Sequence, residues 1–364
     1  HYSDPNIVDS IWTAVTRMGY NGGPTLEPAT GIGHFFGKRP HNLPIEMHGI
    51  ELDPVSGRIA QQLYQSADIK ITGYEDVRLQ ENRYNLIISN VPFGDYKPYE
   101  EKQNRTPGLD NRSSIHDFYF LKSLYGLREG GLIAFITSRY TLDKEDTAIR
   151  ERIAEKADFI GAIRLPNNAF KQIANTEVVT DVVFLQKRPE DQEMSDQTKK
   201  FIHTANILIP DSNDTNLSFS INQYFIDHPE MVIGKHDIGS MYSGKDYTVS
   251  LSDNDLKRRI DAAISFLPEN IMNVIVNEKT KHLDDSVNCV FSHIDISAIP
   301  RGSFVVGPDN RLYQKSFLSG KIELSPLYQN EQKNKDAILR IMLMSSIRDC
   351  VKEAIDHYHN GQTI

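Results

Sequence analysis

Apolar positions in the first half of the chain follow two spacings, one typical of helices and one typical of strands. Between Ile7 and Met18 they recur at helical spacing, which predicts a helix that Asp4 caps and Pro5 opens. Farther on, short apolar runs alternate with longer amphipathic segments. The runs predict strands at 25–29, 47–53, 68–73, 84–89, 130–138, 158–166 and 180–188, and the longer segments predict helices at 54–65, 116–127 and 144–156.

This alternation predicts an α/β fold in which helices cover both faces of a mostly parallel sheet. The last two expected strands have no helix-length segment between them, so we expect an antiparallel hairpin at one edge. Polar residues 189–200 follow and indicate a domain boundary. We therefore expect a main domain at 1–190 and a smaller α+β region at 191–364, with an accessory or linker role.

Patterns in the C-terminal region are weaker. Ser252 to Asp255 resembles a capping box that opens a helix ending at Leu267. Residues 302–314 are typical of a hairpin. A long amphipathic helix is expected at the end of the chain, and its apolar positions are Ile338, Ile341, Ile347, Val351 and Ile355.

Length and composition set limits on the class of protein. The 364 residues exceed what one core usually holds, which agrees with a main domain and a smaller companion. The net charge of −9 argues against a protein that grips nucleic acid with its whole surface, but it leaves room for a local basic cleft. Cys289 and Cys350 are far apart, so we expect a reducing, cytoplasmic setting with no disulfide framework and no zinc site.

The ends of the chain and its apolar runs bear on location. No run approaches the length of a membrane span, and the amino terminus lacks the layout of a signal peptide. The chain opens on His1 without an initiator Met, which favours a piece of something longer.

Unusual residues stand at the ends of three expected strands. They are the segment from Glu27 to Gly33, the pair Glu51 and Asp53, and the segment 90–93. In an open parallel sheet, ligands bind beyond the carboxyl ends of the strands. The three segments should therefore meet at one ligand site.

The first of these segments contains two glycines that let a ligand approach the backbone closely. Gly31 and Gly33 do not complete a dinucleotide fingerprint, because Phe36 stands at the third glycine position. An NAD site is therefore disfavoured. Two phosphate-loop look-alikes, at Gly37-Lys38 and in "GSMYSGKD", also lack a required residue.

Glu51 ends the second strand. A carboxylate at this position can accept hydrogen bonds from both hydroxyls of a ribose, as in other nucleotide-binding sheets. A solvated strand end is the alternative interpretation.

Residues 90–93 read Asn-Val-Pro-Phe. The side-chain oxygen of Asn90 and the carbonyl of Val91 can accept the two hydrogens of an exocyclic amine. Phe93 can stack on the ring that carries this amine, and Pro92 stiffens the segment. The alternative, a simple Asn-x-Pro turn with a packed Phe, is disfavoured by the ribose carboxylate and the glycine turn nearby.

Several motifs together resemble a known family. "LEPATGIGHF", "GIELD" and "SNVPFGDY", after an amino-terminal "HYSDP", resemble the N6-adenine DNA methyltransferases that use S-adenosylmethionine. More closely, they resemble the methylase portion of the large methylase–helicase proteins of bacterial mobile elements and phages. "IHDFYFLKSL", "GAIRLPNNAFK", "TEVVTDVVFLQKR" and "INQYFIDHPEMVIGK" extend the resemblance over residues 1 to about 235. It implies a class I methyltransferase fold, Rossmann-like, with a seven-stranded sheet.

The resemblance also implies roles for individual residues. Val91 departs from the second proline of most adenine methylases, but only its carbonyl is needed. Glu75 is expected at the cofactor adenine, with Asp76 as the alternative. Phe93 and Phe170 are expected at the substrate base. The residues implied at the cofactor are Tyr2, Ser3, Glu27, Pro28, Thr30, Gly31, Gly33, Glu51, Glu75 and Asn90.

The expected reaction is methyl transfer from S-adenosylmethionine to the N6 of an adenine flipped out of duplex DNA. It requires neither a metal nor a covalent intermediate. The expected partners are DNA and a helicase region on the same polypeptide, with no membrane, and restriction–modification is the expected setting. Methylation of cytosine C5 is excluded because no cysteine stands beside Pro92. Another amine substrate, such as an RNA base or a protein glutamine, and a catalytically idle recognition or scaffold module remain as alternatives.

The segment from Gly94 to Ser114 is too long for a simple connection, which favours contact with the substrate. It contains four basic and four acidic residues, so the sequence shows no basic patch there.

Overall fold

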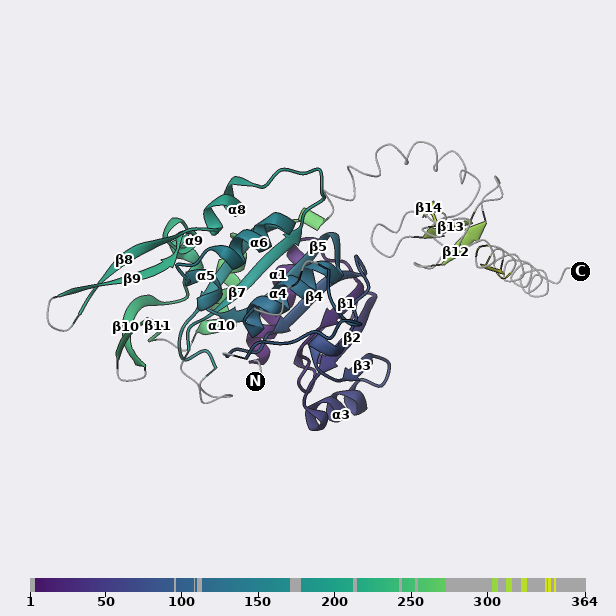
Figure 1. The fold of residues 1–364 in the computed structure, drawn as a ribbon, viewed down its shortest axis with the longest axis horizontal. Helices are drawn as coiled ribbons and strands as arrows, with labels where there is room; N and C mark the ends of the chain where they lie inside the picture. The colour runs from purple at the N-terminus through teal and green to yellow at the C-terminus, as the bar shows by residue number, and fades with distance from the viewer. Residues whose placement is uncertain are drawn as a thin grey trace, which may run out of the picture. The chain divides into compact units, whose positions relative to one another are not determined.

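A seven-stranded sheet organises the first half of the computed structural model (Figure 1). The structure describes residues 4–94, 96–107, 109, 113–170, 178–211, 215–241, 244–252, 255–272, 303–306, 312–315 and 322–325, and four positions between 338 and 344. The strands of the sheet are β1 (Gly23–Glu27), β2 (Ile45–Glu51), β3 (Asp68–Ile71), β4 (Tyr84–Asn90), β5 (Leu127–Ser138), β6 (Ala157–Leu165) and β7 (Thr180–Lys187).

The strands lie in the order β3-β2-β1-β4-β5-β7-β6. Neighbours from β3 to β5 are parallel, whereas β7 runs antiparallel to both β5 and β6. The predicted fold class is thereby confirmed, including the hairpin at one edge. The parallel part matters for function because it brings the carboxyl ends of β2, β1 and β4 together.

Helices and short turns connect the strands and cover the sheet. They are α1 (Pro5–Arg17), α2 (His34–Gly37), α3 (Pro54–Leu63), η1 (Tyr74–Asp76), α4 (Ile115–Gly126), α5 (Tyr140–Asp143), α6 (Ala148–Lys156), α8 (Asp196–Phe201), α9 (Gln223–Asp227), η2 (Pro229–Met231) and α10 (Leu256–Ile264). Helix α1 begins as predicted, with the Asp4 side chain accepting the Asn6 N–H at 2.7 Å and proline in the first turn.

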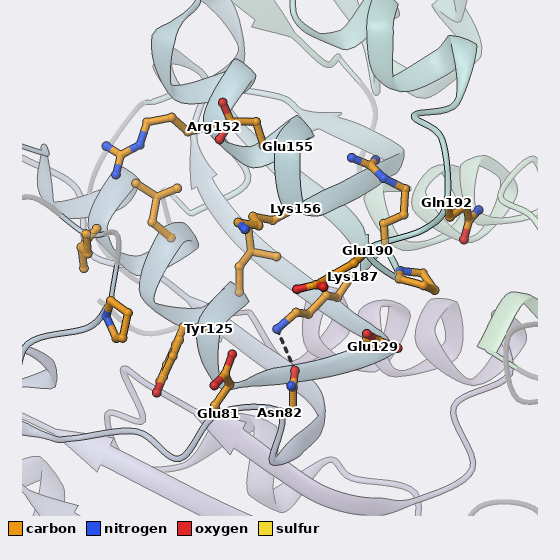
Figure 2. Close-up of a pocket in the computed structure, with 16 residues that line it drawn as sticks. Glu81, Asn82, Tyr125, Glu129, Arg152, Glu155, Lys156, Lys187, Glu190 and Gln192 are labelled. Atoms are coloured by element: carbon orange, nitrogen blue, oxygen red, sulfur yellow. Dashed lines mark hydrogen bonds between the residues drawn. The ribbon is translucent and has the colours of Figure 1, made fainter. Parts of the chain in front are cut away.

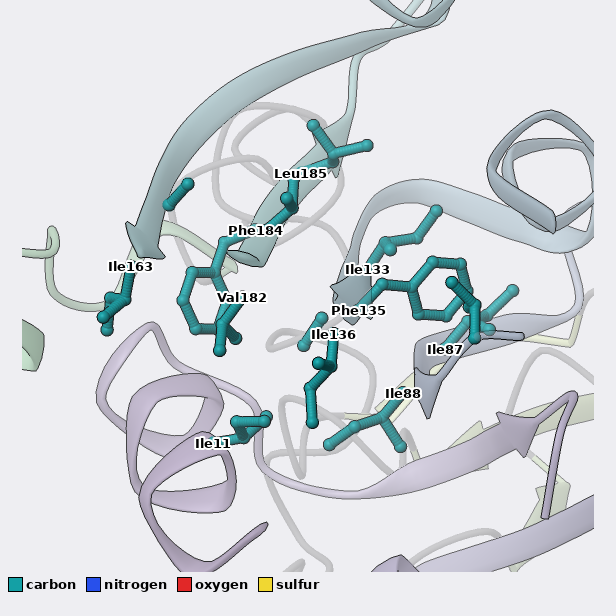
Figure 3. Close-up of a cluster of buried hydrophobic side chains, with 14 of the residues drawn as sticks. Ile11, Ile87, Ile88, Ile133, Phe135, Ile136, Ile163, Val182, Phe184 and Leu185 are labelled. Atoms are coloured by element: carbon teal, nitrogen blue, oxygen red, sulfur yellow. The ribbon is translucent and has the colours of Figure 1, made fainter. Parts of the chain in front are cut away.

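The core lies on both faces of β4 and β5. Every residue of β4 is buried, as a strand covered on two sides requires. Figure 3 shows Ile88 and Ile136 on the face of the sheet toward Ile11 of α1, and Ile87 on the opposite face with Phe135. On the other face, the ring of Phe120 in α4 meets that of Phe135 edge-on, with 5.1 Å between centroids.

Two predicted helices begin later in the structure than in the sequence pattern. The helix expected from Lys144 begins at Ala148, where Asp146 Oδ1 accepts the Ala148 N–H at 3.0 Å. A separate turn, α5, precedes it. The helix expected from a capping box at Ser252 begins at Leu256, with Asp255 itself as the N-cap residue, so the box does not form as predicted.

Beyond the sheet, two hairpins were not predicted. They are β8 (Thr204–Pro210) with β9 (Asn216–Asn222), and β10 (Lys235–Met241) with β11 (Gly244–Ser250). In Figure 1 both extend from the side of the sheet that carries β6 and β7.

The chain forms two compact units, His1–Met272 and Asn273–Ile364. The polar segment 189–200, expected as a domain boundary, lies inside the first unit. There α8 packs on β6, with the rings of Phe201 and Phe159 stacked at 4.4 Å. The division into functional domains at residue 190 stays a prediction.

The second unit contains a small antiparallel sheet of β12 (Phe304–Val306), β13 (Leu312–Lys315) and β14 (Ile322–Leu324). Pairing of Phe304 with Gln314 confirms the predicted hairpin, although its turn lies outside the described residues. Of the predicted terminal helix, Ile338 is helical and buried, and Ile347, Val351 and Ile355 lie outside the described residues.

Candidate active site

Three strand ends meet at the carboxyl edge of the sheet. Glu27 ends β1, Glu51 ends β2 and Asn90 ends β4. Because β1 lies between β2 and β4 and all three strands are parallel, these side chains share one edge. The structure thus brings together the three segments that the sequence singled out.

The Glu51 carboxylate joins two loops. Its Oε2 accepts the Gly31 N–H at 2.6 Å, and its Oε1 accepts the Asp53 N–H at 2.7 Å. Asp53 in turn caps α3 by accepting the Ser56 N–H at 2.8 Å. Each carboxylate oxygen can accept a further hydrogen bond, so Glu51 can still accept from both hydroxyls of a ribose, as predicted.

The turn after β1 has left-handed backbone at Gly31 (φ 56°) and Gly33 (φ 86°). A Cβ atom at Gly31 would meet no atom within 4 Å, so a ligand can approach the backbone there. At Gly33 a Cβ would collide with the ring of Tyr64. The two glycines therefore have different roles. Gly31 leaves open space for a ligand, and Gly33 lets the ring of Tyr64 pack against the backbone.

Pro28 and Thr30 belong to the frame of this turn. Pro28 is buried. The Thr30 hydroxyl donates to the Glu27 carbonyl at 2.9 Å, and its N–H donates to the Ile50 carbonyl at 3.0 Å. Thr30 thus fastens the turn to β2, which is a supporting role beside the predicted cofactor contact.

Glu27 has a buried side chain, with 2% of the residue exposed. Its Oε2 has no hydrogen-bond partner among the residues that the structure describes. Burial, followed by the negative charge of Glu51, raises the pKa of the Glu27 carboxyl well above its usual range. A buried acceptor without a partner is the arrangement that a cationic ligand group would satisfy, such as the ammonium of a methionine moiety.

Asn90 is buried as well, and its Oδ1 also lacks a partner within the described part of the chain. The backbone around it is held firmly, since the Val91 N–H donates to the Ile136 carbonyl of β5 at 3.0 Å. Val91 is fully buried, so a valine side chain serves here as core packing. The unused oxygen of Asn90 is thus fixed at the strand end.

Pro92 and Phe93 follow at the rim, and both are half-buried. Phe170 comes from the loop after β6 and is buried, with 6% exposed. The Asn167 N–H donates to the Val249 carbonyl at 2.9 Å, which fastens the start of that loop to β11. The predicted place of Phe170 beside the substrate base stays a prediction. Tyr2 and Ser3 lie outside the described residues.

Glu75 lies in η1, the short turn after β3. Its carboxylate folds back over Gly73, where an added Cβ would fall 2.9 Å from both oxygens. Its charge raises the pKa of the Tyr96 hydroxyl, and that of Asp76 does so more weakly. The choice of Glu75 over Asp76 at the cofactor adenine stays a prediction.

Tyr119 of α4 is a candidate site residue that the sequence did not indicate. Its ring packs against that of Tyr74 in η1, the turn that also carries Glu75, with 4.8 Å between centroids. Burial raises the pKa of its hydroxyl, and the charges of Glu75 and Glu51 raise it further. The sequence predicted a helix at 116–127 but not its neighbours, and in the structure α4 is buried on nearly every side.

A separate cavity of about 510 Å³ opens at the opposite edge of the sheet (Figure 2). Its lining includes Glu81 and Asn82, just before β4, and Lys187 at the end of β7. The Lys187 ammonium donates to Asn82 Oδ1 at 2.9 Å and to the Leu127 carbonyl at 2.8 Å. This cavity is distant along the strands from Asn90, so we do not assign the transfer chemistry to it.

Neither a spanning helix nor a metal cluster occurs among the residues that the structure describes. No helix there is long and apolar enough to cross a membrane. In the same residues, no group of three His, Cys, Asp or Glu side chains is placed to hold a metal ion.

The sheet order, the antiparallel last strand and the acid- and glycine-bearing edge define a class I methyltransferase, which is a class dependent on S-adenosylmethionine. The model of the N-6 DNA methylase family matches residues 41–238, more than half of the chain. The chain belongs to this family, that of the adenine-specific DNA methyltransferases. The matched segment includes Glu51 and Asn90 but begins after the glycine turn.

A curated relative is the Defense against restriction protein B of Escherichia phage P1. It is 28% identical over an alignment of 224 residues that covers 58% of this chain. The chain spans only 9% of the length of that relative.

Solved structures of low identity resemble the chain in outline. The M protein of type I restriction enzyme EcoKI is 12% identical, with a TM-score of 0.46, over 82% of this chain and 75% of its own. A class I methyltransferase from Listeria monocytogenes is 16% identical, with a TM-score of 0.44, over 53% and 63%. A modification subunit from Vibrio vulnificus is 17% identical, with a TM-score of 0.43, over 53% and 48%.

Proposed function

We propose that this chain transfers the methyl group of S-adenosylmethionine to the N6 amine of an adenine flipped out of duplex DNA. The observation that carries the proposal is the buried Asn90 oxygen, which lacks a partner in the described structure and stands at the strand end just before Val91, Pro92 and Phe93. An adenine inside a duplex cannot present its amine to a pocket of this kind, so the base must leave the stack.

The residues at the carboxyl edge suit the cofactor. S-adenosylmethionine supplies a methyl group on a sulfonium, which is electrophilic without further activation. Glu27 offers a buried acceptor to the ammonium of the methionine part, and Gly31 offers open backbone beside it. Glu51 would accept from the ribose, and Glu75 would face the adenine. Pro28, Thr30 and Gly33 would shape the turn, and Tyr2 and Ser3 stay predictions.

Asn90 and Val91 would act on the substrate amine. The lone pair of an adenine amine is delocalised into the ring, which makes the amine a poor nucleophile. Two acceptors, Asn90 Oδ1 and the Val91 carbonyl, would draw its hydrogens toward tetrahedral geometry and localise that lone pair. Phe93 would hold the ring by stacking, a contact worth about 1–3 kcal/mol per base. The proton can leave to water afterwards, so no general base is assigned.

The acceptor can be identified directly. The 364-residue chain would be incubated with isotopically labelled S-adenosylmethionine in three separate reactions, which contain duplex DNA, RNA or a protein mixture as the substrate. Mass spectrometry of the digested products should find N6-methyladenine from DNA only, and none with Asn90→Ala. Labelled cytosine, labelled RNA or labelled glutamine would instead assign the chain to another amine substrate.

We also propose that the chain is the methylase portion of a longer protein with a helicase region, and that it works in a restriction–modification setting. The phage P1 relative is much longer than this chain, and its name refers to restriction, which supports the longer protein and the setting. The helicase region rests on the resemblance of the sequence motifs alone. Residues 191–364 would be the accessory region, for DNA recognition or as a linker. The net charge of −9 suggests that the chain alone binds duplex DNA weakly, whereas the residues at the carboxyl edge should let it bind the cofactor well. A gel-shift comparison with the full-length protein at matched salt tests this, and equal affinities would contradict it.

A further inference from the structure

The loop that follows Phe93 is fastened to α4 by an ion pair inside the protein. The Lys122 ammonium donates to Glu100 Oε1 at 2.6 Å, and both side chains are fully buried. The ammonium also lies over the ring of Tyr74, 5.0 Å from its centroid. An ion pair so placed holds only one arrangement of the loop, because separating the two groups would leave an uncompensated buried charge.

Further contacts fix the loop around this pair. The Thr106 N–H donates to Glu100 Oε2 at 2.9 Å, and the Thr106 hydroxyl donates to Oε1 at 2.8 Å. Pro98 and Leu109 are buried on either side. The loop thus has buried positions at 98, 100, 106 and 109. Of the other described residues between 98 and 107, Asn104 is half-buried and the rest are exposed.

The buried ion pair changes the charge that the loop presents. The sequence of residues 94–114 has four basic and four acidic residues. Glu100 is buried and neutralised by Lys122 from outside the loop. Without Glu100, the sequence of the loop has four basic and three acidic residues, a net charge of +1 (four minus three). Within residues 96–107, Lys97, Lys102 and Arg105 are exposed, as is the acid Glu101.

Two tyrosines are exposed on the same loop. Tyr96 is 59% exposed, and the charge of Glu75 raises the pKa of its hydroxyl. Tyr99 is 63% exposed. An exposed aromatic ring among cations is the combination with which proteins hold unpaired bases and their phosphates.

We propose that Lys97, Tyr99, Lys102 and Arg105, the loop surface, bind the DNA strand that flanks the flipped adenine. Tyr99 stacks on a base, and the three cations contact phosphates. Tyr96 marks the inner end of this surface, on the side of the cofactor. The proposal rests on the proposed function and extends it, because it assigns the contacts that hold the substrate outside the catalytic pocket.

Charge removal tests the phosphate contacts. The triple variant Lys97→Gln, Lys102→Gln, Arg105→Gln would be compared with the triple variant Lys199→Gln, Lys200→Gln, Lys257→Gln. The control cations are exposed too, but they lie on α8 and α10. Fluorescence anisotropy with labelled oligonucleotides of mixed sequence would give DNA affinity over a salt series.

The loop triple variant should lower the slope of log affinity against log salt by about two to three, since each duplex phosphate contact contributes about 0.9. The control triple variant should change it little. Equal changes in the two variants would overturn the phosphate contacts, because any loss of charge would then suffice.

Tyr99→Ala should weaken binding of a labelled single strand roughly 5- to 150-fold, whereas Tyr99→Phe should keep most of the affinity. Unchanged affinity in Tyr99→Ala would overturn the stacking contact.

Cofactor affinity, measured by calorimetry, should stay at the wild-type value in every loop-surface variant. If the wild type methylates DNA and these variants do so with an unchanged KM for DNA, the loop surface is wrong and the proposed function stands. A wild type that methylates no DNA contradicts the proposed function itself.

Discussion

The N–H of Gly31 donates to the Glu51 carboxylate across 2.6 Å, and so the turn after β1 is tied to the end of β2. Glu51, the residue expected to bind the ribose, therefore also holds the open backbone at Gly31 in place. A change at Glu51 should disturb both parts at once.

Glu51→Gln should weaken binding of S-adenosylmethionine and of its demethylated product. The amide keeps one acceptor oxygen where the carboxylate has two, and each charge-assisted hydrogen bond is worth about 1.5–3 kcal/mol. Isothermal calorimetry on the purified chain measures this loss. Glu46→Gln is the matched control, because it changes an exposed acid at the other end of β2. Equal affinities in Glu51→Gln and the wild type would remove Glu51 from the cofactor site.

Asn90→Ala should abolish methyl transfer and leave cofactor affinity nearly unchanged, because the side chain acts on the acceptor amine. The variant should not lose stability through this oxygen. A buried acceptor without a partner costs about 1–3 kcal/mol, and alanine removes it. Transfer of labelled methyl groups and thermal unfolding are measured on the same samples. Wild-type transfer rates in the variant would refute the acceptor pair, whereas a large drop in Tm would show that Asn90 is a structural residue.

Glu27→Gln should change how stability depends on pH. The folded-state pKa of Glu27 is raised by burial and by Glu51, whereas an unfolded glutamate titrates near pH ~4.3. Between these two values the folded state retains a proton that the unfolded state has lost. The free energy of unfolding therefore falls as pH rises above ~4.3, by up to about 1.4 kcal/mol per pH unit, until the folded pKa is reached.

Urea unfolding at a series of pH values should show a flatter profile for Glu27→Gln than for the wild type in this window. Glu190→Gln, a change to an exposed carboxylate outside the site, should leave the profile unchanged. Parallel profiles for Glu27→Gln and the wild type would mean that Glu27 is ionised in the folded protein.

The Glu100–Lys122 pair should show strong coupling in a double-mutant cycle. Glu100→Gln or Lys122→Met alone leaves the other group buried without its charge partner, at a cost of about 3–5 kcal/mol. The double variant should be more stable than the sum of the two losses implies. As a matched control, Lys200→Met breaks an exposed pair with Asp227 and should cost less than about 1 kcal/mol. Strict additivity in urea unfolding would show that the buried pair does not hold the loop.

Much of the sheet was predictable because its strands are buried on both faces. Short continuous apolar runs such as Leu86–Ile88 and Leu132–Ile136, placed between helical segments, are typical of strands that helices cover on both faces. The two hairpins after residue 203 escaped prediction for the opposite reason. Their strands are partly exposed, and β8 has only Ile209 buried, so the apolar pattern is interrupted.

The site was predictable where chemistry coincides with a strand end. Glu51 and Asn90 directly follow apolar runs, so parallel topology alone brings them together. Tyr119 was not predictable, since its place near Glu51 and Glu75 depends on how α4 packs. Glu100 was misjudged as a surface charge, because its partner Lys122 lies in another element. Counting charges along a loop assumes that all of them face water.

The position of β7 between β5 and β6 has a consequence for synthesis on the ribosome. Strand β6 is made before β7, yet it joins the sheet through β7, from Ala157 with Lys187 to Leu165 with Thr180. Until residue 187 has left the exit tunnel, β5 therefore has an unpaired apolar edge, and β6 has no neighbour in the sheet. Nascent chains stalled before Thr180 should accordingly engage chaperones and resist protease poorly, whereas chains released after β7 should gain protection in one step.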